Sequence, residues 1–74
     1  MILRQIVLSE KSPFIGKSLK DSGIRDEYNC MVVGVDEGQI HITLINPSHA
    51  LTVGDILWVV GEKENIKQIQ ATNE

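Results

Sequence analysis

The stretch LTVGDILWVVGEKENIKQI, residues 51–69, carries the strongest structural signals in the chain. Gly54 and Asp55 have the character of a turn, because glycine tolerates a left-handed backbone and aspartate can accept a hydrogen bond from a nearby backbone N–H. The apolar and β-branched run over residues 56–61 follows directly and predicts a strand. We expect Gly61 to end this strand and to let the chain swing into the next element.

The segment that follows the strand predicts a closing helix over residues 62–70. Ile66 and Ile69 are three positions apart, and charged or polar residues lie between and around them. This spacing indicates an amphipathic helix with one apolar face toward a core. Residues 71–74 are expected to fray, as chain ends commonly do. The whole stretch is therefore scaffold, with no nucleophile, metal cluster or phosphate loop.

Before this stretch the chain predicts one strand and one short helix. Residues 3–9 are mostly apolar and indicate a buried strand. In residues 15–22 the apolar side chains are four positions apart, which is typical of a short amphipathic helix. Gly23 is a natural end for it, because glycine readily adopts the left-handed conformation of a helix C-terminus. Ile24 is expected to return to the core.

Two further strands are predicted over residues 30–35 and 39–45, joined by a tight turn at residues 36–38. In the second of them apolar and polar residues alternate, which predicts a strand with one buried and one wet face. The expected orientation is inward for Ile40, Ile42 and Leu44, and outward for His41 and Thr43.

These elements predict one small α+β domain over residues 1–74, in the order β-α-β-β-β-α, with a mostly antiparallel sheet and two short helices. A chain of 74 residues is near the lower size limit for a self-supporting core. Burial against a second copy or a larger parent protein would stabilise it. The sequence also begins almost directly with a strand, as a fragment cut from a larger protein would. Both features favour an interaction module.

Composition excludes several classes of protein. The net charge of −3 and the scattered basic residues argue against a nucleic-acid surface. Cys30 is the single cysteine, so no internal disulfide can form and a reducing compartment fits best. No apolar run approaches the roughly 18 residues that a membrane span requires. We therefore expect a soluble chain.

The candidate catalytic and metal-binding groups all have simpler explanations. Gly16–Ser18 reads GKS, but Lys11 occupies the position where a phosphate-binding loop needs its first glycine. His41 and His49 have no acidic or cysteine partner at ligand spacing and are interpreted as surface residues. The adjacent carboxylates at residues 26–27 are expected to face water. We predict no enzyme, no metal site and no cofactor.

Arg25 is the most informative polar residue. It follows a buried isoleucine and precedes a strand, in a short connection where side chains can converge on a ligand. Arginine suits planar, bidentate contact with carboxylate or phosphate. A solvated surface arginine is the alternative interpretation. Cys30 opens an apolar strand and is interpreted as a small buried hydrophobic residue.

The full pattern resembles the C-terminal domain of RCK proteins, also called the TrkA-C domain. The resemblance is carried by SPFIGKSLKDSGIRDEYNCMVVGV at residues 12–35 and by NPSHALTVGDILWVVGEKENI at residues 46–66. It covers residues 3–69 and rests on the Gly-Lys-x-Leu helix start, the Ile-Arg pair and the Gly-Asp-x-Leu-x-Val-x-Gly block.

The resemblance implies a cytoplasmic regulatory domain of a potassium transporter, channel or cation/proton antiporter. Such domains pair as homodimers, and in some members a cleft between the two copies binds cyclic di-AMP. By position, this implies a ligand site at Ile24, Arg25, Asn29 and Cys30. Ligand-binding members often have histidine or asparagine where Cys30 and Met31 stand here, which puts the identity of the ligand in question.

The implied mechanism is a shift between dimer geometries that is passed to a membrane transport domain. Two alternatives stay open at this point. One is a dimerisation module without a ligand, and the other is the effector domain of a transcription regulator.

Overall fold

The computed structural model describes residues 1–42 and 48–73. These residues form four strands and two helices in the predicted order, which confirms the α+β class. In chain order the elements are β1 (Ile2–Val7), α1 (Leu19–Ser22), β2 (Met31–Glu37), β3 (Ile40–Ile42), β4 (Ile56–Gly61) and α2 (Lys63–Thr72).

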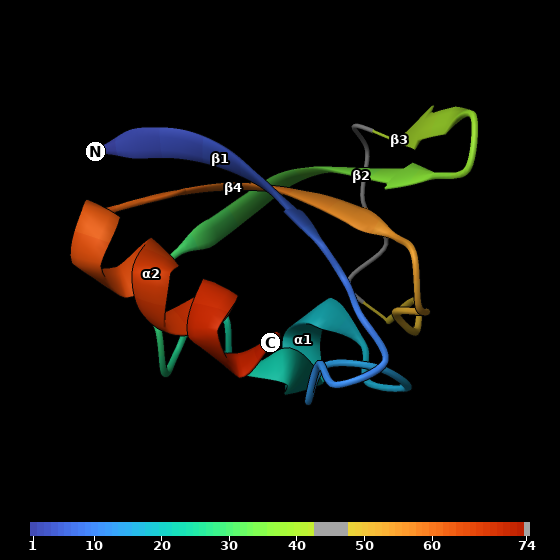
Figure 1. Ribbon diagram of the computed structural model, residues 1–74, viewed down its shortest axis with the longest axis horizontal. Coiled ribbons are helices and arrows are strands. Elements are labelled where there is room, and N and C mark those ends of the chain that lie inside the picture. Colours follow the sequence, from blue (N-terminus) through green and yellow to red (C-terminus); the bar gives the residue numbers. More distant parts are fainter. Residues whose placement is uncertain (43–47, 74) are drawn as a thin grey trace.

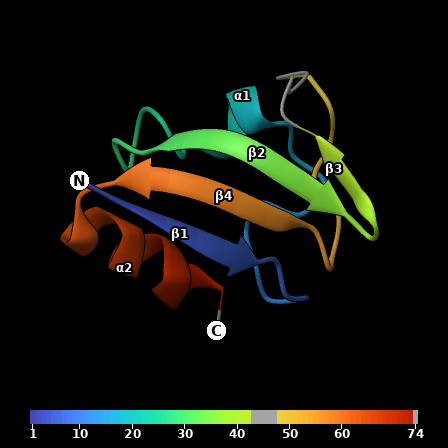
Figure 2. The same ribbon diagram turned by 90° about the horizontal axis from the view of Figure 1, so that it is seen from above.

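The four strands make one antiparallel sheet in the order β1-β4-β2-β3 (Figure 2). The last strand, β4, lies between the first and the second and therefore pairs on both sides. Leu57 is paired with Ile6 of β1 and with Val35 of β2, and all three side chains are buried. A register shift between Val32 and Gly34 marks a bulge in β2. The strand at the centre of the sheet is thus the apolar run that dominates the sequence.

Both helices and their connecting segments lie on one face of the sheet (Figure 1). α2 packs against β1 and β4. α1 lies on the β2 side of the molecule (Figure 2). The core fills the space between these two layers. Its buried apolar residues are Ile6, Leu8, Phe14, Ile24, Cys30, Val35, Leu51, Leu57, Val59, Ile66 and Ile69.

The closing helix confirms the predicted inner face and corrects the predicted end of the chain. Ile66 and Ile69 are buried, as expected. The helix continues through Thr72, and Asn73 is tied to the edge of β1. The Ser9 N–H donates to Asn73 Oδ1 at 2.8 Å, and the Asn73 side-chain amide donates to the Val7 carbonyl. The tail predicted to fray over residues 71–74 thus continues the helix and makes contacts as far as Asn73, and residue 74 lies outside the described range.

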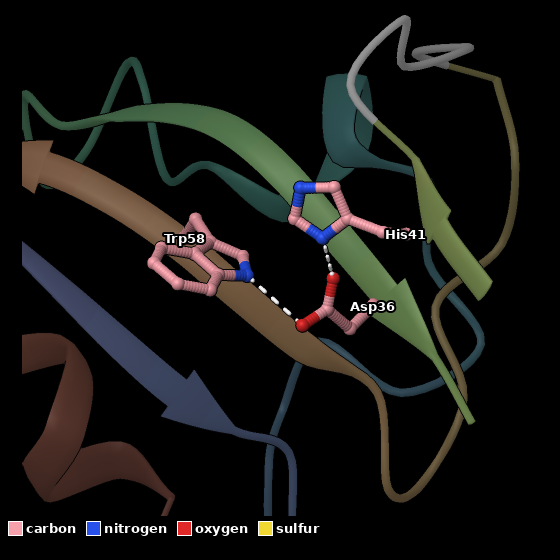
Figure 3. A network of polar contacts seen from close by, with 3 residues as sticks. All are labelled: Asp36, His41 and Trp58. Carbon is pink, nitrogen blue, oxygen red and sulfur yellow. Dashed lines mark hydrogen bonds and ion pairs between the residues drawn. The ribbon is translucent and has the colours of Figure 1, made fainter. Parts of the chain in front are cut away.

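Three side chains form a polar network on the sheet face opposite the helices (Figure 3). The Trp58 indole N–H donates to Asp36 Oδ2 at 3.1 Å, and His41 Nδ1 contacts Asp36 Oδ1. The imidazole and indole rings also meet edge to face, with their centroids 5.9 Å apart. Because the three residues come from β4, β2 and β3, the network holds the short strand β3 to the rest of the sheet.

The second histidine also has an acidic neighbour. His49 Nε2 lies 2.7 Å from Oε1 of Glu37, which is the residue after Asp36. Both histidines are exposed, as predicted, but each contacts a carboxylate that the spacing in the sequence did not indicate. Asp36 and Glu37 were predicted to lie in the tight turn, whereas they form the last two residues of β2.

Two further predictions need correction. The helix predicted over residues 15–22 begins only at Leu19, because Gly16 has a left-handed φ of 81° and the Ser18 side chain caps the helix. Ile40 was expected to face the core and is 63% exposed, since it lies at the hairpin end of an edge strand. The expected orientations of Thr43 and Leu44 fall outside the described residues.

Candidate functional site

An open hollow of about 630 Å³ lies where the C-terminal end of α1 meets the N-terminal end of β2. Its walls are mainly apolar, with two cationic side chains and one carboxylate. The lining residues are Leu19, Lys20, Gly23, Ile24, Arg25, Asp26, Cys30, Met31 and Val32. Ligand pockets typically have volumes of roughly 300–1,000 Å³ and combine apolar walls with a few polar groups.

The segment from Gly23 to Cys30 builds one wall of this hollow. Gly23 ends α1 with a left-handed φ of 82°, and its carbonyl accepts hydrogen bonds from the Glu27 and Tyr28 amides at 2.7 and 3.3 Å. The Cys30 amide closes the segment by donating to the Ile24 carbonyl at 3.1 Å. These contacts form a compact turn that places its apolar residue in the core and its charged residues at the surface.

Within this turn, Ile24 and Arg25 point to different environments. Ile24 is only 2% exposed and belongs to the core, whereas Arg25 is exposed and lines the hollow. Among residues 1–42 and 48–73, no ion pair or hydrogen bond engages the Arg25 guanidinium. Its donors are therefore available for an anion, which a guanidinium can bind in bidentate fashion.

Two other charged side chains modify the field around Arg25. Lys20 lines the same hollow and adds a second positive charge, while the Asp26 carboxylate adds a negative one. Glu27 is not among the lining residues, although its carboxyl group lies close to Gly23, which lines the hollow. The hollow thus carries two cations and one anion, which favours an anionic ligand with apolar or aromatic parts.

Cys30 supplies a buried, uncharged wall. It is 3% exposed, and its thiol donates to the Tyr28 carbonyl at 3.3 Å. Burial raises the pKa of this thiol above its ordinary value, since an apolar environment disfavours the thiolate. The structure confirms that Cys30 is a small buried hydrophobic residue.

The structure also changes the reason for the glycine at position 61. A Cβ added there would lie 2.6 Å from Cys30 Sγ, which is a severe overlap. Gly61 does not adopt a positive φ, so the predicted need for backbone freedom is wrong. The residue is required because β4 passes directly against the cysteine that lines the hollow.

The predicted site residues are only partly brought together. Ile24, Arg25 and Cys30 line the hollow, but Asn29 does not. Asn29 has a φ of 54°, a left-handed conformation that asparagine tolerates better than most residues, so its place is explained by the turn before β2. The lining residues that the site prediction missed are Leu19, Lys20, Gly23, Asp26, Met31 and Val32. Most of them are close in sequence to the predicted residues, and this closeness was the signal from which they could have been predicted.

Neither a metal centre nor a membrane-spanning helix is found in the described part of the chain. Residues 1–42 and 48–73 contain no group of three or more His, Cys, Asp or Glu side chains that could hold a metal ion. None of the helices in these ranges is long and apolar enough to cross a bilayer.

Comparison with known proteins identifies the same module in transport proteins. The sequence pattern of the TrkA-C domain matches residues 3–72. Potassium channel protein 1 of Methanocaldococcus jannaschii is 31% identical over 70 residues, which is 95% of this chain and 21% of the channel. An uncharacterized transporter of Bacteroides thetaiotaomicron is 38% identical over 63 residues, which is 85% of this chain and 12% of the transporter. The chain thus spans about a fifth or less of these relatives.

Solved structures share the fold. The RCK C domain of the potassium transport protein KtrA, solved in complex with cyclic di-AMP, superposes with a TM-score of 0.85 at 26% identity, covering 93% of this chain and 79% of that one. The RCK C domain dimer of BusR from S. agalactiae, also solved with cyclic di-AMP, has a TM-score of 0.84 at 19% identity, covering 97% of this chain and 95% of that one.

Proposed function

We propose that this chain, which belongs to the TrkA-C domain family, is a regulatory domain of a potassium or other cation transporter. In this proposal the domain acts at the cytoplasmic face of the membrane, pairs with a second copy and binds an anionic ligand such as cyclic di-AMP. It regulates rather than catalyses. The domain would be attached to a transport domain, for which the relatives leave room, since the match covers 21% of the channel and 12% of the transporter.

The observation that carries the proposal is the guanidinium of Arg25, which has no partner within residues 1–42 and 48–73 and lines a largely apolar hollow. Cyclic di-AMP has two phosphates related by symmetry and two flat aromatic bases whose faces can pack against apolar side chains. In a symmetric dimer, Arg25 and its counterpart in the second copy would be related by the same two-fold axis. Each guanidinium could then meet one phosphate, while Leu19, Met31 and Val32 offer apolar surface to the bases.

The mechanism would be a population shift. A ligand that touches both copies favours the dimer geometry in which its contacts are best, by an amount equal to the difference in binding free energy between the geometries. Connection to the transport domain would carry this bias to the transport pathway. The complex of the KtrA domain with cyclic di-AMP supports the ligand class, because that domain shares both fold and sequence with this one.

Calorimetric titration with cyclic di-AMP, combined with sedimentation, tests the proposal. We expect one nucleotide to bind for every two chains. Arg25→Ala should weaken binding by at least about tenfold, since a charge-assisted hydrogen bond contributes roughly 1.5–3 kcal/mol. Arg4→Ala is the matched control: Arg4 is the other arginine of the chain, is exposed, lies on β1 and does not line the hollow.

Three results would contradict parts of the proposal in different ways. Equal losses for the Arg25 and Arg4 variants would show that only net charge matters and that the hollow is not the site. A stable dimer that binds no nucleotide would favour the dimerisation module without a ligand. A parent protein with a DNA-binding domain in place of a transport domain would favour the effector domain of a transcription regulator.

A further inference from the structure

The side chain of Ser22 joins the end of α1 to the turn that carries Arg25. Ser22 is only 6% exposed. Its hydroxyl donates to the Leu19 carbonyl at 2.7 Å and accepts from the Ile24 amide at 3.3 Å. The same hydroxyl group thus donates one hydrogen bond within the last turn of the helix and accepts another from the residue that follows Gly23.

These two contacts matter because α1 has only four residues, Leu19–Ser22. The last carbonyl groups of any helix lack partners within the helix, and a helix of one turn has almost no other backbone bonds to hold it. The Ser22 hydroxyl supplies the Leu19 carbonyl with a partner. It also satisfies the buried amide of Ile24, which would otherwise be left without one.

The Ile24 amide immediately precedes Arg25 in the backbone. Three backbone bonds span Arg25: those from Glu27 and Tyr28 to the Gly23 carbonyl and that from Cys30 to the Ile24 carbonyl. On the upstream side Ile24 is also held by its burial in the core, and the Ser22 hydroxyl adds a side-chain contact that links the Ile24 amide to the last turn of the helix. Arg25 has no side-chain hydrogen bond or ion pair of its own within residues 1–42 and 48–73, so its direction depends on these backbone contacts.

We propose that Ser22 is a positioning residue of the hollow: its hydroxyl orients the backbone at Ile24 and thereby the direction in which Arg25 presents its guanidinium. Ser22 does not line the hollow and need not touch a ligand. Its effect on ligand affinity rests on the proposed function, whereas its effect on the order of the turn does not.

The experiment compares Ser22→Ala with Ser18→Ala. Ser18 stands at the other end of the same helix, where its hydroxyl accepts from the Asp21 amide at 3.3 Å, and it does not line the hollow. Both variants remove one hydroxyl from one end of α1. We expect ¹⁵N relaxation of the free protein to show the Arg25 amide falling from a rigid order parameter of about 0.85 to below about 0.6 in Ser22→Ala alone. Cyclic di-AMP binding should weaken about five- to twentyfold in the same variant, as expected when a binding group loses its preorganisation.

A second pair of variants tests the hydroxyl group at constant side-chain shape, and its threonine member keeps the hydroxyl if alanine at position 22 prevents folding. Ser22→Thr and Ser22→Val have the same shape and differ in the hydroxyl group. We expect the threonine variant to keep Arg25 ordered and the valine variant to release it. Equal order in these two, or equal mobility and affinity loss in Ser22→Ala and Ser18→Ala, would overturn the assignment. If the wild-type protein binds no cyclic dinucleotide, the proposed function fails, and the order parameters of the free protein still decide the role of Ser22.

Discussion

Replacing Gly61 by alanine should destabilise the domain by about 1–2 kcal/mol. The new Cβ would lie 2.6 Å from Cys30 Sγ and 3.3 Å from Cys30 Cβ, and both residues are buried. Overpacking of this kind costs roughly 1–3 kcal/mol. Gly61 has no positive φ, so alanine can adopt its backbone conformation. Alanine also lowers the conformational entropy of the unfolded chain, which stabilises the folded state by about 0.4–1 kcal/mol. The difference is a large part of the stability of a domain held by about 0.05–0.15 kcal/mol per residue.

A double-mutant cycle with Cys30→Ala isolates this contact. Removing the sulfur alone should cost about 1 kcal/mol, close to the value of one buried methylene group. In the Cys30→Ala background the overlap with sulfur is gone and only the 3.3 Å approach to Cβ of residue 30 remains. This small residual cost is offset by the restriction of the unfolded chain, so the net cost should fall close to zero and the coupling free energy should be about 1–2 kcal/mol. Urea unfolding, followed by Trp58 fluorescence and far-UV circular dichroism, gives the four free energies. The reasoning is refuted if Gly61→Ala is neutral, or if it costs the same in both backgrounds.

Three other predictions concern single groups. Trp58→Phe should lower the free energy of unfolding by about 1 kcal/mol, because it removes the indole donor to Asp36, and thermal unfolding should show a midpoint lower by about 4–8 °C; an unchanged midpoint would mean that the bond contributes nothing. Asp26→Asn should tighten cyclic di-AMP binding about two- to fivefold at low salt, since it removes the negative charge beside Arg25; calorimetry at two salt concentrations checks this, and weaker binding would instead show that the carboxylate accepts a bond from the ligand. Because burial raises the pKa of Cys30 above 9.0, the folded state favours the neutral thiol. Its contribution to stability should be present below pH 9.0 and fall as the pH rises above that value, measured as the difference between wild type and Cys30→Ala; a difference that is constant from about pH 7 to 10 would contradict this.

The sequence predicted those parts of the fold that depend on local patterns. The strand over residues 56–61 agrees with β4 at both ends, and the inner face of α2 at Ile66 and Ile69 is as expected. Gly23 and Gly54 both adopt the left-handed conformation that their positions suggested. Asp55 accepts the Thr52 amide at 3.0 Å, as its place before the strand indicated. In each case the cause lies within a few residues of the effect.

The site was less predictable, because its walls come from segments that only folding brings together. Arg25 and Cys30 were predicted from their neighbours and the resemblance, whereas Leu19 and Lys20 line the same hollow because folding brings the end of α1 near the start of β2. The requirement for Gly61 likewise depends on a residue 31 positions earlier, its neighbour Cys30. Sequence spacing alone gives no measure of such contacts.

The two contacts of histidines with carboxylates were missed for a related reason. Asp36 and His41 face one another across the pairing of β2 with β3, so their contact depends on the register of the hairpin. The register in turn depends on β2 continuing through Glu37, whereas the apolar pattern predicted an end at Val35. An error of two residues at a strand end therefore concealed both partners.

The hydrogen bonds of Asn73 to the edge of β1 have a practical consequence for anyone who produces this domain. The side-chain amide offers one donor and one acceptor to Val7 and Ser9, as an adjoining strand would. A shortened chain that stops before Asn73 would leave those backbone groups bare, and bare sheet edges recruit other chains and aggregate. With Asn73 in place this end of β1 is closed to such recruitment. The hollow lies beside β2, away from this end of β1 (Figure 2), so the contacts of Asn73 leave it open.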